Sequence, residues 1–105
     1  MDDLVKLALK MDALGHPLRL RFVVLLYRGG PMYLSELAKR AGVSRALAKV
    51  HLIKLQKAGI VKSTVALVPD EAKALRYYEL VDFDIRVSPA VISGYLGEDG
   101  GGRGE

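Results

Sequence analysis

The segment 44–58 carries side chains that suit contact with a polyanion. It contains no acid and four basic residues, which are Arg45, Lys49, Lys54 and Lys57. Ammonium and guanidinium groups neutralise phosphates, and a guanidinium can also donate two parallel hydrogen bonds to the edge of a guanine base. The chemistry that this segment could perform is therefore binding, to the phosphates and bases of a nucleic acid.

Helical spacing gives the same segment an inner face. Ala48, Leu52 and Leu55 recur at i, i+4 and i+7, which predicts one stripe packed against the rest of the chain. His51 borders this stripe, and we expect it to be packed or hydrogen-bonded, with a phosphate contact as the alternative. Neither His51 nor His16 has a serine or carboxylate placed near it in sequence to suggest a catalytic relay, so no catalytic site is expected.

The outer face holds the side chains that we expect to contact DNA. The N-terminal half of a recognition helix lies deepest in the major groove, so Arg45, Ala46 and Lys49 are the predicted base contacts. Ala46 or Val50 could meet a thymine methyl group, whereas Val50 and Ile53 could instead face the groove wall. For the lysines nearer the C-terminal end, contact with phosphate and simple exposure to solvent are equally consistent with the sequence. The predicted DNA-binding residues are Ser44, Arg45, Ala46, Lys49, Val50, Ile53, Lys54, Lys57, Lys62, Lys73 and Arg76.

A helix-turn-helix would position this outer face. Helices are expected at 34–41 and 44–58, with Gly42 and Val43 forming the tight turn between them. Ser44 follows that turn at once and is the expected N-cap of the second helix. The turn residues therefore set the angle at which the second helix is presented.

Two further helices are expected before this motif. Apolar residues recur at three- and four-residue spacing over 4–14, which predicts an amphipathic helix that ends at Gly15. Pro17 starts a second helix, because its missing N–H costs little at the first helical position. That helix is apolar on most sides and is expected to lie at the centre of the core. After it, Met32 and Tyr33 could form a very short strand.

After Gly59 the hydrophobic period changes from about 3.6 residues to 2. Residues 60–68 and 75–87 are therefore expected to form two strands, and Ser88 is expected to cap a short closing helix in 90–96. These elements predict an α+β, mainly α fold. It is a winged helix-turn-helix with a three-helix core, a two-stranded wing, an N-terminal helix and a short C-terminal helix.

The predicted wing carries basic residues but has an acidic tip. Lys62, Lys73 and Arg76 lie on or beside it and would contact flanking phosphates or the minor groove. The tip, Pro69-Asp70-Glu71, is unusual for a loop that faces DNA. Either the tip turns away from the DNA backbone or this wing contributes little to binding.

Two stretches of the sequence resemble the ArsR family. ALGHPLRLRFVVLL, residues 13–26, is similar to the helix that opens the DNA-binding domain of that family. YLSELAKRAGVSRALAKVHLIKLQKAGIV, residues 33–61, follows at the expected distance and is similar to the family's helix-turn-helix. The resemblance implies a winged helix-turn-helix transcriptional regulator, most often a repressor, that is a homodimer paired through its terminal helices. A composition without cysteine or asparagine fits an archaeal member, and scarce thermolabile residues are a thermophile trend.

The metal-binding residues of that family are missing. Tyr33, Leu34 and Ser35 occupy the region where arsenic and cadmium sensors carry cysteines, and this chain has no cysteine. Zinc and nickel sensors use side chains of the last helix, but SPAVISGYLGED contains no histidine. The resemblance therefore implies no metal inducer, and we expect no metal and no cofactor.

Both ends of the predicted domain offer more apolar surface than a small winged helix needs. The residues concerned are Leu4, Leu7, Met11, Val91, Ile92, Tyr95 and Leu96. A homodimer interface between the N-terminal helix and the C-terminal segment is the favoured interpretation, and two-fold pairing would place two recognition helices about one DNA turn apart. The alternative is that these residues cover the core of the monomer.

Two arginines of the second helix match positions of the ArsR pattern. They are Arg19 and Arg21. We expect at least one of them to be structural and to pair with a carboxylate such as Glu36.

Charge and hydropathy along the chain limit the possible functions. The net charge is +4, Glu36 is the only acid between residues 13 and 62, and acids outnumber bases after residue 62. No apolar run approaches the roughly 20 residues that cross a bilayer, and the acidic N-terminus is unlike a signal peptide. We expect a soluble, cytoplasmic protein that is not an enzyme, with one domain over 1–96 and a disordered Gly-rich tail over 97–105.

Three functions are compatible with this pattern. The first is a dimeric, sequence-specific regulator that binds double-stranded DNA, and the second is an architectural DNA-binding protein with little sequence preference. The third is a protein-interaction winged helix in a larger complex. The concentration of positive charge between residues 13 and 62 argues against the third, because such a module needs no basic face.

Overall fold

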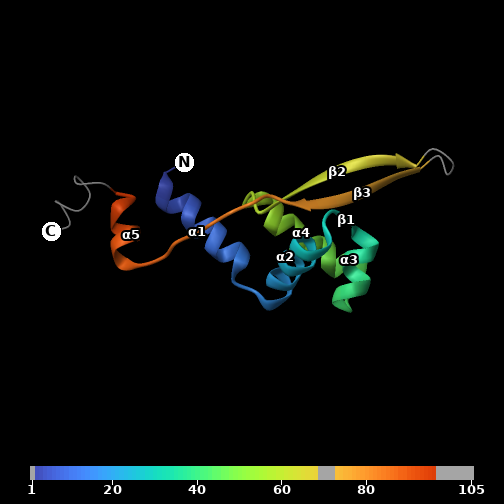
Figure 1. Cartoon of the computed structure of the whole chain (residues 1–105), viewed down its shortest axis with the longest axis horizontal. Coiled ribbons are helices and arrows are strands. Elements are labelled where there is room, and N and C mark those ends of the chain that lie inside the picture. The colour runs from blue at the N-terminus through green and yellow to red at the C-terminus, as the bar shows by residue number, and fades with distance from the viewer. Residues whose placement is uncertain (1, 69–72, 97–105) are drawn as a thin grey trace.

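The computed structural model describes residues 2–68 and 73–96, which form five helices and a small antiparallel sheet (Figure 1). The elements in chain order are α1 (Asp3–Leu14), α2 (Pro17–Gly29), β1 (Met32–Tyr33), α3 (Leu34–Ala41), α4 (Arg45–Lys57), β2 (Val61–Val68), β3 (Lys73–Leu80) and α5 (Pro89–Gly94). The α+β winged helix-turn-helix expected from the sequence is confirmed. No helix of this described part is both long enough and apolar enough to cross a bilayer.

The turn between α3 and α4 has the geometry that its sequence predicts. Gly42 adopts a left-handed conformation with φ of 72°, which glycine reaches without steric cost. The next amide, that of Val43, donates to the carbonyl of Ala38 at 3.0 Å and closes α3. Ser44 then caps α4, because its Oγ accepts from the amide of Leu47 at 3.1 Å. The turn and cap together fix where α4 begins.

The three strands form one sheet with the order β1-β3-β2. β2 and β3 pair antiparallel from Val61 opposite Leu80 to Val68 opposite Lys73. This hairpin is the wing, and it extends away from the helices in Figure 1. Its acidic tip lies outside the described residues, as does the tail expected over 97–105.

The second predicted strand is shorter than expected, and its predicted end at Val87 is wrong. The ladder stops at Leu80, and the amide of Val81 donates to the carbonyl of Ile60 at 2.8 Å, where β2 has not yet begun. An alternating pattern needs a neighbouring strand to become sheet, and none is present beyond this point in the described residues. The alternation instead lets Phe83 pack against the core from an extended segment.

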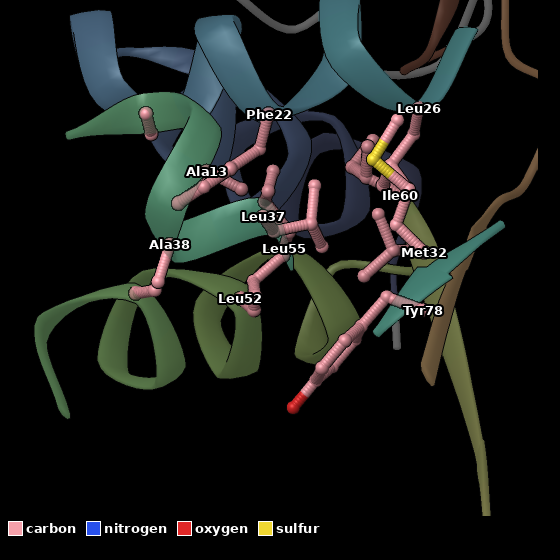
Figure 2. Packing of buried hydrophobic residues seen from close by; sticks show 13 residues of the cluster. Ala13, Phe22, Leu26, Met32, Leu37, Ala38, Leu52, Leu55, Ile60 and Tyr78 are labelled. Atoms are coloured by element: carbon pink, nitrogen blue, oxygen red, sulfur yellow. The ribbon is translucent and has the colours of Figure 1, made fainter. Parts of the chain in front are cut away.

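The core lies where α2, α3 and α4 meet the base of the wing. Its largest fully buried side chains are Phe22, Leu37, Leu52, Leu55, Ile60, Val61 and Tyr78. Figure 2 shows these helices and the sheet converging on one cluster, with the hydroxyl of Tyr78 directed away from it. Burial raises the pKa of the Tyr78 phenol. A core that includes residues of both α4 and β3 holds the predicted recognition helix and the wing in one rigid frame.

The predicted closing helix forms but does not cover the core. α5 is capped by Ser88, whose Oγ accepts from the amide of Val91 at 3.1 Å. No residue of α5 is buried. Figure 1 shows α5 beyond the N-terminal end of α1, after the extended segment 81–88. The apolar side chains of α5 therefore lie on the surface of this single chain.

Candidate nucleic-acid interface

The inner and outer faces of α4 lie as the helical spacing predicts. Ala48, Leu52 and Leu55 are each 0% exposed, so the predicted inner stripe is confirmed. Arg45 and Lys49, which point away from that stripe, are exposed. The burial of one face leaves α4 with a single outward surface, which begins at the capped N-terminus.

Most of the predicted DNA-binding residues share the exposed surface of α4. The exposed ones are Ser44, Arg45, Ala46, Lys49, Val50, Ile53, Lys54 and Lys57 on this helix, with Lys62 and Arg76 on the wing. Lys73 begins β3, opposite Val68 in the ladder. Lys62 lies apart from the rest at the base of the wing, since it pairs in register with Glu79 and its ammonium is 3.8 Å from that carboxylate.

The basic side chains of this surface differ in their partners. Lys54 forms an ion pair with Asp12 of α1 at 2.8 Å, and Arg76 donates to Ser63 Oγ at 2.8 Å. Arg45 and Lys49 form no ion pair within residues 2–68 and 73–96. Two cations in the first half of α4 are therefore available to an incoming polyanion without breaking an ion pair in this part of the chain.

A small hollow brings the start of α3, the start of α4 and the wing together. Its lining includes Tyr33, Ser35, Arg45 and Arg76. Tyr33 also contacts Tyr77 edge to face, with ring centroids 6.0 Å apart. Both arginines were predicted from the sequence, whereas Tyr33 and Ser35 were not. The pairing of β1 with β3 places Tyr33 opposite Tyr77, next to Arg76. Hydroxyl groups next to two guanidinium groups can donate to phosphate oxygens.

Arg19 is structural, as expected, but its predicted partner is wrong. Glu36 pairs with Arg40 one helical turn later, at 2.8 Å. Arg19 is only 7% exposed and donates from Nη1 to Nδ1 of His51 at 2.8 Å. Its Nε donates to the carbonyl of Ala13 and its Nη2 to the carbonyl of Asp12. One buried guanidinium thus connects the end of α1 to the middle of α4.

His51 is a packed, hydrogen-bonded residue, which confirms the favoured prediction. Because a guanidinium can only donate, Nδ1 of His51 must accept, and the neutral ring carries its proton on Nε2. Burial lowers the pKa of His51, and the nearby His16, Arg19 and Lys54 lower it further. The ring centroids of His16 and His51 are 4.5 Å apart.

His16 has a role that the sequence analysis did not assign. Its Nδ1 accepts from the amide of Leu18 at 3.0 Å and caps α2, one residue before Pro17. Both histidine rings therefore use Nδ1 as an acceptor. Within residues 2–68 and 73–96, no group of three or more His, Cys, Asp or Glu residues is placed to hold a metal ion.

Comparison with known proteins bears on the same region. The sequence profile of a helix-turn-helix domain family matches residues 14–64, which run from the end of α1 into β2. An uncharacterized HTH-type transcriptional regulator of Methanocaldococcus jannaschii is 32% identical to this chain over 90 residues. That match covers 86% of this chain and 88% of the relative. The similarity thus extends beyond the helix-turn-helix to nearly the whole of both chains.

Proposed function

This chain belongs to the family of HTH-type transcriptional regulators, and we propose that it represses transcription by binding a specific double-stranded DNA sequence as a homodimer. One observation carries the proposal. The first half of α4 presents Arg45 and Lys49, exposed and without an ion pair in the described residues, on a helix whose opposite face is completely buried. A rigid helix with free basic side chains at its N-terminal half suits insertion into the major groove.

Within this proposal, contacts to bases and to phosphates come from different parts of the surface. Arg45, Ala46 and Lys49 contact base edges, and Arg45 donates two hydrogen bonds to a guanine. Ser35 and Arg76 flank Arg45 in the hollow beside the wing and bind the adjoining phosphates. Phosphate contacts position α4 in the groove, and base contacts select the sequence.

The proposed homodimer uses two apolar surfaces that a single chain leaves open. Of the side chains of α1 predicted for this surface, Met11 is 43% exposed, but the prediction for Leu7 is wrong because Leu7 is only 7% exposed and packs within the single chain. Val5, which was not predicted, is 45% exposed on α1. On α5 and just after it, exposed apolar side chains are Val91, Ile92, Tyr95 and Leu96. Since α5 contributes nothing to the core, a second copy that covers both surfaces is favoured over the alternative in which they close the monomer.

Selection of bound sequences from a random pool of DNA duplexes tests the proposal. A specific dimeric regulator enriches a pseudo-palindrome whose half-sites lie about one helical turn apart. Enrichment of no sequence, together with an affinity that depends only on salt, would instead support the architectural function. Failure to bind any duplex at low salt would favour the protein-interaction alternative.

A control variant separates recognition from general electrostatics. Arg45→Ala and Arg86→Ala each remove one positive charge, but Arg86 lies in the extended segment before α5, with its side chain 81% exposed. Arg45→Ala is expected to abolish enrichment of the selected sequence. Arg86→Ala is expected to enrich the same sequence as the unmodified chain.

A further inference from the structure

An apolar groove runs between α1 and α4. It has a volume of about 430 Å³, and its floor includes Leu9 of α1 with Val50, Ile53 and Ala58 from α4 and its C-cap. A second hollow of about 270 Å³ shares Leu9 and Ala58 with it and extends the groove towards Gly59. The larger hollow alone is in the size range of sites that bind small molecules, about 300–1,000 Å³.

The two ends of this groove differ in charge. At one end Asp12 and Lys54 face each other at 2.8 Å, so their charges compensate. The hydrogen bond from Lys54 and its charge hold the pKa of Asp12 below the usual range, so this carboxylate stays ionised at neutral pH. At the other end Lys6, Lys10 and Lys57 line the second hollow. These three lysines form no ion pair within the described part of the chain. Asp3 and Asp84 line a neighbouring hollow with Lys6 and Lys10, so the three lysines outnumber the acids near this end and leave it with a net positive charge.

We propose that this groove binds a small amphipathic anion, namely an aliphatic or aromatic carboxylic acid. Its hydrocarbon part would lie on Leu9, Val50 and Ile53, which are 43%, 63% and 37% exposed in the free chain and would lose water contact on binding. Its carboxylate would lie among the lysines of the positive end. Neither a cation nor a fully polar anion matches an apolar floor with a positive end.

The position of the groove links such a ligand to DNA binding, and this link rests on the proposed function. Val50, Ile53 and Lys57 line the groove and also belong to the predicted DNA-contacting surface. A carboxylic acid in the groove would cover these side chains and neutralise part of the positive charge. It therefore binds in competition with DNA and acts as a releasing effector.

Calorimetric titration with decanoate, kept below its micelle concentration, tests the site without DNA. Decanoate is expected to bind. Decyltrimethylammonium has the hydrocarbon chain but a positive charge, and acetate has the negative charge but no long hydrocarbon chain, so neither is expected to bind. Leu9→Ser is expected to weaken decanoate binding about tenfold or more, because it removes the apolar floor on the α1 side. Val24→Ser, which changes a side chain of α2 that is also 43% exposed, serves as the matched control and should bind decanoate like the unmodified chain.

Three outcomes would overturn the site. They are equal binding of decanoate and decyltrimethylammonium, unchanged decanoate binding by Leu9→Ser, and conversion of a dimer to a monomer by Leu9→Ser, which would mean that a second copy occupies the groove.

The link to DNA is tested separately, with the duplex selected above. Decanoate should release the unmodified chain but not Leu9→Ser, which retains every predicted DNA-contacting residue. Binding of decanoate with no release of DNA would overturn the link alone, and absence of any DNA binding would overturn the proposed function while the calorimetric result stands.

Discussion

Nη1 of Arg19 lies 2.8 Å from Nδ1 of His51, and this contact joins α2 to the middle of α4. The same guanidinium also holds the last turn of α1 through the carbonyls of Ala13 and Asp12. The proposed DNA-binding helix is therefore oriented by a buried polar contact as well as by its apolar stripe. A guanidinium that satisfies three acceptors at once has no simple substitute.

Loss of this guanidinium should destabilise the fold. Arg19→Met keeps an apolar stem but leaves the Ala13 carbonyl and His51 Nδ1 without their donor, so unfolding should become easier by about 3 kcal/mol. Urea unfolding followed by circular dichroism measures the change. Arg21→Met removes an exposed arginine from the same helix and should change stability by less than about 0.5 kcal/mol. Equal effects of the two substitutions would show that the buried contact contributes nothing.

Acid should weaken the same contact. The folded chain lowers the pKa of His51 from 6.5, so the unfolded chain takes up a proton first as the pH falls. The stability that comes from the neutral ring is therefore complete above pH 6.5. It is lost as the pH falls from there towards the lowered pKa of His51 in the folded chain. Protonation would also place an N–H on Nδ1, where Arg19 already donates.

A comparison of two proteins isolates that histidine from other titrating groups. Urea unfolding of the unmodified chain and of His51→Gln is measured between about pH 7.5 and about pH 5, across the usual range of histidine titration. The unmodified chain should lose more stability over this interval than the variant does. If stability fell equally with pH in both proteins, His51 would not be the cause of the loss.

The turn between the two motif helices should tolerate few residues. Gly42 has a φ of 72°, and a Cβ built there would meet no atom within 4 Å, so only the backbone conformation opposes a side chain. Gly42→Ala should cost about 1–2 kcal/mol, and Gly42→Asn less, because asparagine visits the left-handed region more readily. Thermal unfolding of the two variants measures which of them is the more stable. Equal stabilities would argue against the left-handed turn.

The proposed dimer depends on apolar side chains near the C-terminal end of the described chain. Tyr95→Glu places a charge where a second copy should pack and is expected to give a monomer in sedimentation experiments. Tyr27→Glu makes the same change at a side chain of α2 that is 78% exposed and should leave the assembly intact. An unmodified chain that sediments as a monomer at all accessible concentrations would contradict the dimer directly.

Local signals in the sequence predicted the helices well. Periodicity and capping residues located α1 to α5 because both depend on neighbours within a few residues, as Gly42 and Ser44 illustrate. The end of β3 at Leu80 was missed because a strand also needs a partner, and the chain facing Val81 is still in the turn after α4. Alternation alone does not contain that information.

Contacts between distant residues were harder to predict. The pairing of Arg19 with His51 joins residues 32 positions apart, and nothing in the local pattern distinguishes His51 from Glu36 as its partner. The placement of Tyr33 beside Arg45 likewise follows from the pairing of β1 with β3. The groove beneath Leu9 depends on how α1 packs against α4, which no spacing within either helix reveals.

Binding to two duplexes shows whether α4 discriminates between DNA sequences. Fluorescence anisotropy compares the affinity for the selected duplex with that for a scrambled duplex of equal length, for the unmodified chain and for Arg45→Ala combined with Lys49→Ala. The unmodified chain should prefer the selected duplex, and the double substitution should reduce this preference about tenfold or more, since each base contact contributes about 1–3 kcal/mol of discrimination. An unchanged ratio of the two affinities would contradict the assignment of α4 as the helix that reads DNA.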